Sequence, residues 1–146
     1  MTQEVLTVRD LARRSQAAVS AKDRATWLGL FAPDAVVEDP IGPSPLDPDG
    51  AGHRGATAVA AFYDNVIGQA ERISFEIERS YLCGDEVADV GAIRTTLPGG
   101  FTVVVHDVFT YRGDGAGKLA ALRAFWEFDS AAVLDEGSVD SGLAVE

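Results

Sequence analysis

Cysteine is almost missing from this chain, in which Cys83 is the single one among 146 residues. A lone cysteine cannot form a disulfide within the chain, and it excludes a zinc site built on several thiolates. Long apolar runs are missing too, because no stretch approaches the ~20 residues that span a bilayer. The N-terminus also lacks the basic-then-apolar layout of a secretory signal. We therefore expect a cytoplasmic protein that does not bind membranes.

Positive charge is also scarce. The chain has 12 Lys and Arg against 23 Asp and Glu, which gives a formal net charge of -11. Binding to a phosphate backbone needs a basic patch, and the few arginines are scattered along the sequence. We therefore expect no nucleic-acid partner. The hydrophobic fraction of 47% is enough for one substantial core, so the length predicts a single domain.

Helical periodicity marks most of the first half of the chain. Apolar residues recur at helical spacing from Val5 to about Ala21, from the N-cap Asp23 through Phe31, and from Val59 to Val66. A short strand is expected at 35–39. The segment 40–55 is rich in proline and glycine, which predicts a loop.

Strand-like alternation takes over after Gly68, over residues 72–80, 86–97, 101–112 and 119–129. Helices followed by antiparallel strands predict an α+β fold. Three helices would cover one face of a curved antiparallel sheet and enclose a cone-shaped apolar pocket. We expect residues 1–132 to form this domain and residues 133–146 to be a poorly ordered acidic tail.

The first candidate site residue lies in the stretch AVVEDPIG, where two adjacent carboxylates end the short strand. Side chains alternate between the faces of a strand, so Asp39 shares a face with Ala35 and Val37, whereas Glu38 points the other way. An inward carboxylate can act on a ligand. The alternative is that Asp39 only starts an Asp-Pro turn.

The second candidate lies in FTVVVHDVFTYR, whose odd-numbered residues form the more apolar face. Alternation places Asp107 on that face between Val105 and Phe109. An ionised carboxylate is costly there unless it is paired, and a raised pKa would keep it protonated. Two other possibilities remain open: an ion pair with Arg94 or Arg123, or a local bulge that turns the side chain to solvent.

Asp39 and Asp107 gain significance when they are considered together. Two carboxylates from separate strands would face one apolar pocket. If one is ionised and the other neutral, they provide a proton acceptor and a hydrogen-bond donor for the same ligand. This pattern predicts a site for proton-transfer chemistry on an apolar ligand.

Four segments resemble the ketosteroid isomerase branch of the NTF2-like (SnoaL-like) superfamily: LFAPDAVVEDPIG, AVAAFYDNVIG, HDVFTYRGDG and LRAFWEFD. The first and third are the specific ones. The resemblance implies that Asp39 is the general base that moves a proton from C4 to C6 of a 3-oxo-Δ5-steroid through a dienolate. It implies that protonated Asp107 donates to the dienolate oxygen, and that the reaction needs no metal and no organic cofactor.

The same resemblance also indicates supporting residues and one departure. Tyr63 matches the family's supporting tyrosine, and Trp126 matches an aromatic wall. The family's principal oxyanion donor is a tyrosine on the first helix, and an ungapped count back from EDP places Ser15 there. The family's second aromatic partner is here a phenylalanine without a hydroxyl. We expect the substrate to contact Phe31, Phe62, Val105, Phe109 and Trp126.

The serine leaves the function open in specific ways. Tyr63 could swing in as the missing donor, a water held by Ser15 could fill the gap, or isomerase activity could be weak or absent. Besides the isomerase, the alternatives are a non-catalytic protein that binds a steroid or another apolar ligand, and a related cyclase, dehydratase or epoxide hydrolase.

Two further expectations concern the outer surface. His106 falls on the strand face opposite Asp107, between Val104 and Val108, and this apolar outer face predicts a homodimer. His53 lies in the loop GAGHRG and is expected at the surface. Neither histidine has a partner at metal-ligand spacing, so we expect no metal site.

Overall fold

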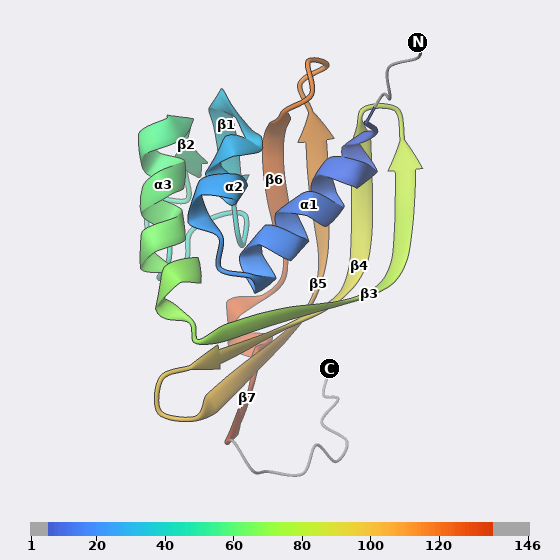
Figure 1. Cartoon of the computed structure of the whole chain (residues 1–146). Helices are drawn as coiled ribbons and strands as arrows, with labels where there is room; N and C mark the ends of the chain where they lie inside the picture. Colours follow the sequence, from blue (N-terminus) through green and yellow to red (C-terminus); the bar gives the residue numbers. More distant parts are fainter. Residues whose placement is uncertain (1–5, 136–146) are drawn as a thin grey trace.

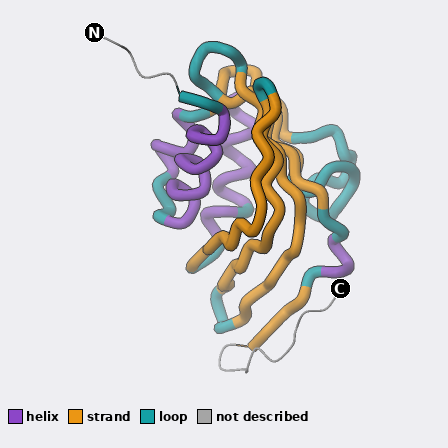
Figure 2. Tube along the Cα trace, turned by 90° about the vertical axis from the view of Figure 1, so that its right-hand side faces the viewer, coloured by secondary structure: helices purple, strands orange, loops and turns teal. Residues whose placement is uncertain are grey.

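The computed structural model of the chain describes residues 6–135 and has two layers (Figure 1). Helices α1 (Val8–Ser20), α2 (Arg24–Gly29) and α3 (Gly55–Asn65) form one layer, and a curved sheet forms the other. Figure 2 shows that α1, α2 and α3 lie on the same side of the sheet. The predicted α+β architecture is therefore confirmed.

The described part of the sheet has seven strands in the order β2-β1-β6-β5-β4-β3, and β7 pairs with β5 beside this path. Every pairing is antiparallel except that of β1 with β6, which is parallel. The early strand β1 thus lies beside the last long strand, β6, and next to the short edge strand β2. The bounds are β1 Phe31–Glu38, β2 His53–Arg54, β3 Arg72–Cys83, β4 Glu86–Leu97, β5 Phe101–Gly113, β6 Leu119–Phe125 and β7 Ala132–Asp135.

The first two helices begin at side-chain caps. Thr7 and Asp10 form a capping box at the start of α1, and Asp23 accepts a hydrogen bond from the backbone N–H of Thr26 at the start of α2. The predicted N-cap is therefore confirmed. The second helix is shorter than expected, because it ends at Gly29 and Phe31 already belongs to β1.

The curvature of the sheet is linked to a register shift in β3, between Ile77 and Arg79. Such irregularities bend a strand. Opposite the bend lies Gly91 of β4, where a Cβ would overlap the backbone oxygen of Glu76. Glycine at this position allows the two strands to approach, and the concave face that results is the one that α1 crosses (Figure 1).

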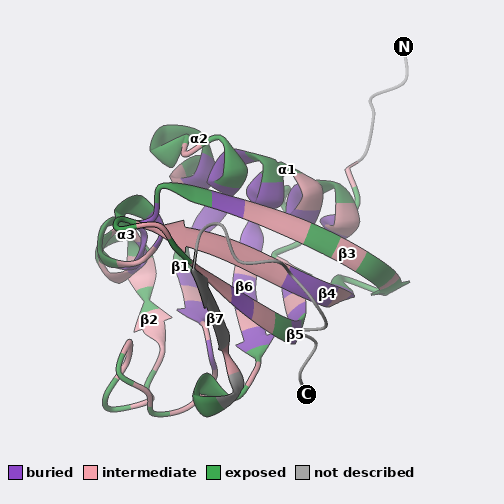
Figure 3. Ribbon diagram, turned by 90° about the horizontal axis from the view of Figure 1, so that it is seen from below, coloured by how far each residue is buried: buried purple, intermediate pink, exposed green. Residues whose placement is uncertain are grey.

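The core fills the space between the helices and this concave face. Figure 3 shows that the buried parts of α1 and α2 are those turned toward the sheet. Trp27 of α2 is fully buried, as are Val37 of β1 and Leu119 of β6. No helix within residues 6–135 is long and apolar enough to cross a bilayer.

The end of the domain differs from the sequence-based expectation. The last long strand ends at Phe125, earlier than expected, and a short 3-10 turn, η2 (Phe128–Ser130), follows it. Residues 132–135, which include the first three residues of the expected tail, pair with the beginning of β5. The rest of that expected tail, 136–146, lies outside the described residues.

Candidate functional site

A cavity with two adjoining compartments lies between the helices and the concave face of the sheet. The inner compartment, with a volume of about 110 Å³, extends to Ser15, Trp27 and Tyr111. The outer compartment, of about 190 Å³, includes Asp107 and Trp126. Both compartments are lined by Asp39, Val66, Ile93 and Thr95. Most of the other lining side chains are apolar, as expected for a small-molecule site.

Asp39 follows the last residue of β1 and lines both compartments. The indole N–H of Trp126 donates a 2.6 Å hydrogen bond to its Oδ1. Burial raises the pKa of Asp39, while the Trp126 bond and the charge of His53 act in the opposite direction. The net pKa of Asp39 is raised by burial, and the hydrogen bond from Trp126, which favours the ionised form, orients its carboxyl group in an apolar setting.

Asp107 lies on the concave face of β5 and is only 6% exposed. Neither of its carboxyl oxygens has a hydrogen-bond partner within the described residues. Burial raises the pKa of Asp107 to about 8, and the nearby charge of Asp39 adds to the shift. The carboxyl group is therefore neutral near pH 7 and can donate a hydrogen bond.

The two other possibilities for Asp107 are thereby excluded. Arg123 instead bonds to Glu38, with 2.7 Å between Nε and Oε1. No arginine is hydrogen-bonded to Asp107 among residues 6–135. The pairing of β4 with β5 is continuous, with Gly91 opposite Asp107, so no bulge turns this side chain to solvent.

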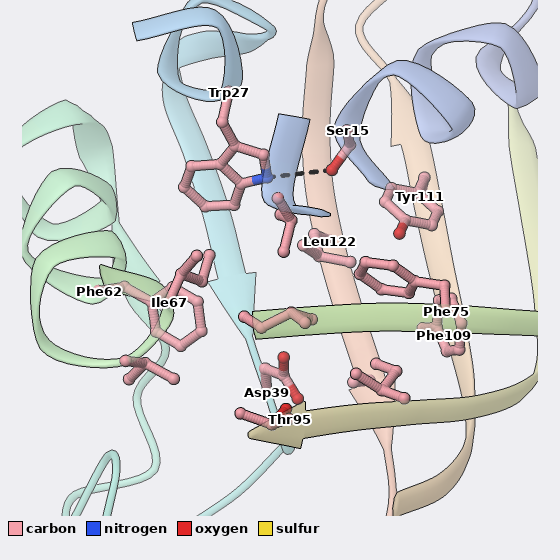
Figure 4. A pocket seen from close by; sticks show the side chains of 15 residues that line it. Ser15, Trp27, Asp39, Phe62, Ile67, Phe75, Thr95, Phe109, Tyr111 and Leu122 are labelled. Atoms are coloured by element: carbon pink, nitrogen blue, oxygen red, sulfur yellow. Dashed lines mark hydrogen bonds between the residues drawn. The ribbon is translucent and has the colours of Figure 1, made fainter. Parts of the chain in front are cut away.

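Besides Thr95, which lines both compartments, two hydroxyl side chains line the inner compartment. Ser15 is 1% exposed and accepts a 3.0 Å hydrogen bond from the indole N–H of Trp27 (Figure 4). Tyr111, at 2% exposure, accepts a 3.2 Å hydrogen bond from the amide nitrogen of Gln16. Sequence reasoning did not single out Tyr111 as a site residue. The signal was present, because Tyr111 shares the odd-numbered face of its strand with Asp107.

Two expected site residues lie outside the cavity lining. Tyr63 and Phe31 are buried against Trp27, with ring centroids 5.6 Å and 4.6 Å away. Neither lines either compartment. The indole of Trp27 lines the inner compartment in their place, so the expected direct contact of Tyr63 and Phe31 with a ligand is not found.

The other expected contact residues do line the cavity. Phe62 and Phe109 line the inner compartment, and Val105 and Trp126 line the outer one. On the outer face of the sheet, His106 and Val108 are exposed, as expected. Val104 differs, because it is 7% exposed and is thus already buried within the single chain.

His53 is more buried than the sequence suggested. It pairs with Val37 in the β1–β2 ladder, and its ring packs on Phe62 with centroids 4.9 Å apart. Its Nε2 is buried without a hydrogen-bond partner among the described residues. The short β2 strand inside the predicted loop brings it there, and nothing in the loop composition indicated this. Residues 6–135 contain no group of three or more His, Cys, Asp or Glu side chains placed to bind a metal ion.

Comparison with known proteins places this geometry in context. The SnoaL-like domain family model matches residues 12–122. A steroid Delta-isomerase from Nocardioides simplex is 32% identical over 114 residues, which are 75% of this chain and 80% of that protein.

Solved structures of similar proteins also include a ketosteroid isomerase. The Delta 5-3-ketosteroid isomerase from Mycobacterium sp. is 41% identical with a TM-score of 0.84, over 89% of this chain and 100% of that one. RV0760c from Mycobacterium tuberculosis, solved in complex with estradiol-17beta-hemisuccinate, is 38% identical with a TM-score of 0.81, over 86% and 97% of the two chains. The chain belongs to the SnoaL-like domain family and has the NTF2-like fold.

Proposed function

We propose that this protein is a ketosteroid isomerase-like enzyme acting on a 3-oxo-Δ5-steroid or a similar apolar ketone. The observation that carries the proposal is the buried, unpartnered carboxyl group of Asp107 in the compartment that Asp39 also lines. A neutral acid and an oriented carboxylate at one apolar cavity are the pair that enolisation of a ketone requires. The isomerases among the relatives support the same chemistry.

The proposed reaction moves one proton and one double bond. The Asp39 carboxylate takes a proton from C4 beside the carbonyl, and the electron pair delocalises into a dienolate. Asp107 donates a hydrogen bond to the dienolate oxygen. Asp39 then returns the proton to C6, which leaves the double bond conjugated with the carbonyl. The bond from Trp126 to Asp39 orients the carboxylate through both steps.

The oxyanion site of this chain has fewer donors than the family pattern implies. Ser15 stands at the position of the tyrosine, and its oxygen accepts from Trp27. Tyr63 packs against Trp27 outside the cavity lining. Loss of one oxyanion donor typically lowers the rate by about 10²–10³. We therefore expect slow isomerisation that depends on Asp107.

The test is turnover of a 3-oxo-Δ5-steroid, followed by the ultraviolet absorbance of the conjugated product. Asp39→Asn removes the base and is expected to lower kcat by about 10²–10⁴. Asp34→Asn is a matched control, since Asp34 is an exposed carboxylate of the same strand. An inactive parent at high protein concentration, or equal activity of Asp39→Asn, would refute the proposal.

A second candidate function is non-catalytic binding of a steroid-like molecule. The observation favouring it is the tyrosine missing from α1, which leaves the oxyanion site short of a donor. The distinguishing measurement compares the affinity of a phenolic steroid, which mimics the dienolate, with that of a neutral ketosteroid. Tighter binding of the phenol supports the isomerase, and equal affinities support a simple binder.

We also propose that the protein forms a homodimer through the outer face of the sheet. Val108 and Phe125 are paired across β5 and β6, and their side chains are 36% and 49% exposed. His106 is exposed beside them. Apolar side chains gathered on one face favour association with another copy. Sedimentation equilibrium of the parent and of Phe125→Lys tests this, and a monomeric parent would contradict it.

A further inference from the structure

His53 lies behind the wall of the cavity, beside the end of β1 that leads to Asp39. It belongs to β2, the edge strand next to β1 (Figure 1). In the β1–β2 ladder it is paired with Val37, whose side chain is fully buried in the core. The ring of His53 packs on Phe62 of α3, which lines the inner compartment. The imidazole therefore points to the side of the sheet that holds the cavity.

This pairing brings the imidazole close to the proposed base. Asp39 lies two residues beyond Val37, so it is a diagonal neighbour of His53 across the two strands. Diagonal neighbours in a ladder lie about 7–8 Å apart. Water screens a charge at that distance only weakly when the two groups are buried. The pKa of Asp39 reflects this, because burial raises it, whereas the hydrogen bond from Trp126 and the charge of His53 oppose the rise.

The imidazole has no hydrogen bond at its buried end. Its Nε2 is buried and has no partner among the described residues. Buried polar side-chain atoms in folded proteins are nearly always bonded, so support of the fold does not explain this one. The residue as a whole is only half-buried, which allows the ring to exchange a proton with solvent. Histidine is also the side chain that ordinarily changes its charge between about pH 5 and 8.

The other basic side chains near this end of β1 are engaged or turned to solvent. No Lys or Arg lines either compartment within the described part of the chain. Arg123 forms an ion pair with Glu38, with 2.7 Å between Nε and Oε1. Arg54, next to His53 in β2, is exposed. The basic side chain whose charge acts on Asp39 is therefore His53.

The acidic groups around β2 leave Asp39 as the partner of the imidazole. The strand packs against β1 and α3. The other acidic or phenolic groups of these two helical and strand elements and of the preceding loop are each exposed, paired or neutral: Asp34 and Asp49 are exposed, Glu38 and Asp64 form ion pairs with arginines, Asp47 accepts a hydrogen bond from the backbone N–H of Gly52, and burial raises the pKa of Tyr63.

A cation beside Asp39 also affects Asp107. Burial raises the pKa of Asp107 to about 8, and the negative charge of Asp39 adds to the shift. An ionised Asp39 thus favours the protonated form of Asp107. Tyr111, a third titratable group at the cavity, stays neutral because burial raises its pKa. A positive charge on His53 therefore favours the combination that the proposed reaction needs, with Asp39 ionised and Asp107 neutral.

We propose that His53 is a positioning residue that, in its protonated form, keeps the Asp39 carboxylate ionised as the pH falls. The imidazole takes its proton from solvent and leaves the bonds of the ligand untouched. The inference rests on the proposed function in that Asp39 acts as the base. It predicts an active pH range that extends further to the acid side than that of a buried carboxylate without a neighbouring cation.

The test is the pH dependence of kcat/KM in the parent and in two neutral variants, His53→Gln and His53→Leu. This quantity reports ionisations of the free enzyme. Loss of the cation should raise the pKa of Asp39, so the acid limb should move to higher pH by about one unit. Near pH 8, where histidine is ordinarily neutral, the variants should stay within about threefold of the parent. Arg54→Gln is the matched control, because it removes an exposed positive charge from the same strand and should leave the profile unchanged.

A second measurement needs no turnover. The carboxyl carbon of Asp39 can be titrated by NMR, and its signal is identified by its absence from Asp39→Asn. Both His53 variants should raise the pKa of this carboxyl by about one unit. An unchanged carboxyl pKa, or a loss of rate that is equal at every pH, overturns the inference and leaves His53 with a packing role only. A raised carboxyl pKa in variants of a parent that never isomerises a 3-oxo-Δ5-steroid refutes the proposed function and leaves the effect of His53 on Asp39 standing.

Discussion

Two buried aspartates on neighbouring strands, Asp89 of β4 and Asp107 of β5, have opposite surroundings. Asp89 is 0% exposed and accepts hydrogen bonds from Arg13 and Gln16. Asp107 is 6% exposed and has no hydrogen-bond partner among the described residues. Asp107 lies opposite Gly91 of β4, and Gly91 is only two residues along that strand from Asp89. The two aspartates are therefore near neighbours in the sheet.

The difference shows that burial alone does not determine the role of a carboxylate. Where donors from α1 reach the sheet, the buried acid holds that helix in place. Beyond the reach of α1, the same residue type is left without donors, and its pKa rises to about 8. The first arrangement stabilises the fold, and the second is available to a ligand.

The largest difference between Asp89 and Asp107 is expected in the isomerase activity of their variants. Asp107→Leu removes the donor to the dienolate and should lower kcat by about 10²–10³. Asp89→Asn, far from the proposed reacting carbonyl, should change kcat less than tenfold. Steady-state isomerase assays of both variants measure this, and an equal loss in the two would remove the distinction between them.

The second effect is on stability, and its sign should differ between the two sites. Asp89→Asn weakens charge-assisted hydrogen bonds and should lower the free energy of unfolding by about 1–3 kcal/mol, toward the lower end because Arg13 is partly exposed. Asp107→Asn should raise it at pH 7 by roughly 1–3 kcal/mol, since the folded parent must hold a proton there. Urea unfolding at pH 7 measures both. Destabilisation by Asp107→Asn would indicate that the acid has a structural partner.

The smallest effects concern pH. The pKa of Asp107 is about 8 when folded and near 3.8 when unfolded, so the folded chain holds an extra proton between these values. The stability of the parent should therefore decrease from about pH 4 to about pH 8 relative to Asp107→Asn, and the two should converge below pH 4. A stability difference that does not vary with pH would contradict the raised pKa.

Activity should follow the same group. Isomerisation needs Asp107 protonated and Asp39 ionised, so kcat should decrease above about pH 8. At the acid end it should decrease at a pH above the usual range of a carboxylate, because burial raises the pKa of Asp39. A pH–rate profile of the parent measures both limbs, and a flat profile through pH 9 would exclude Asp107 as the neutral donor.

Much of the site follows from local patterns. The alternation of side chains placed Asp39 beside Val37, and Asp107 between Val105 and Phe109, on the faces where the structure has them. Such patterns are reliable because a one-residue slip would move a whole apolar face into water. The serine on the first helix also lines the cavity, at the position that the family resemblance indicated.

Other parts depended on contacts that no local pattern contains. The parallel pairing of β1 with β6 joins segments more than 80 residues apart and brings Trp126 to Asp39. The fit of Trp27 between α1 and α3 keeps Tyr63 and Phe31 out of the cavity. The hydrogen bond from Gln16 to the Tyr111 hydroxyl likewise joins residues that are 95 positions apart.

The sequence by itself determined the α+β architecture and the inward direction of the two site carboxylates, because periodicity follows from backbone geometry and the need to bury apolar faces. Only the tertiary structure decided which buried acid is paired and which is left free. That depends on which donors the packed helices bring within about 3 Å, a distance that spacing along the chain does not encode.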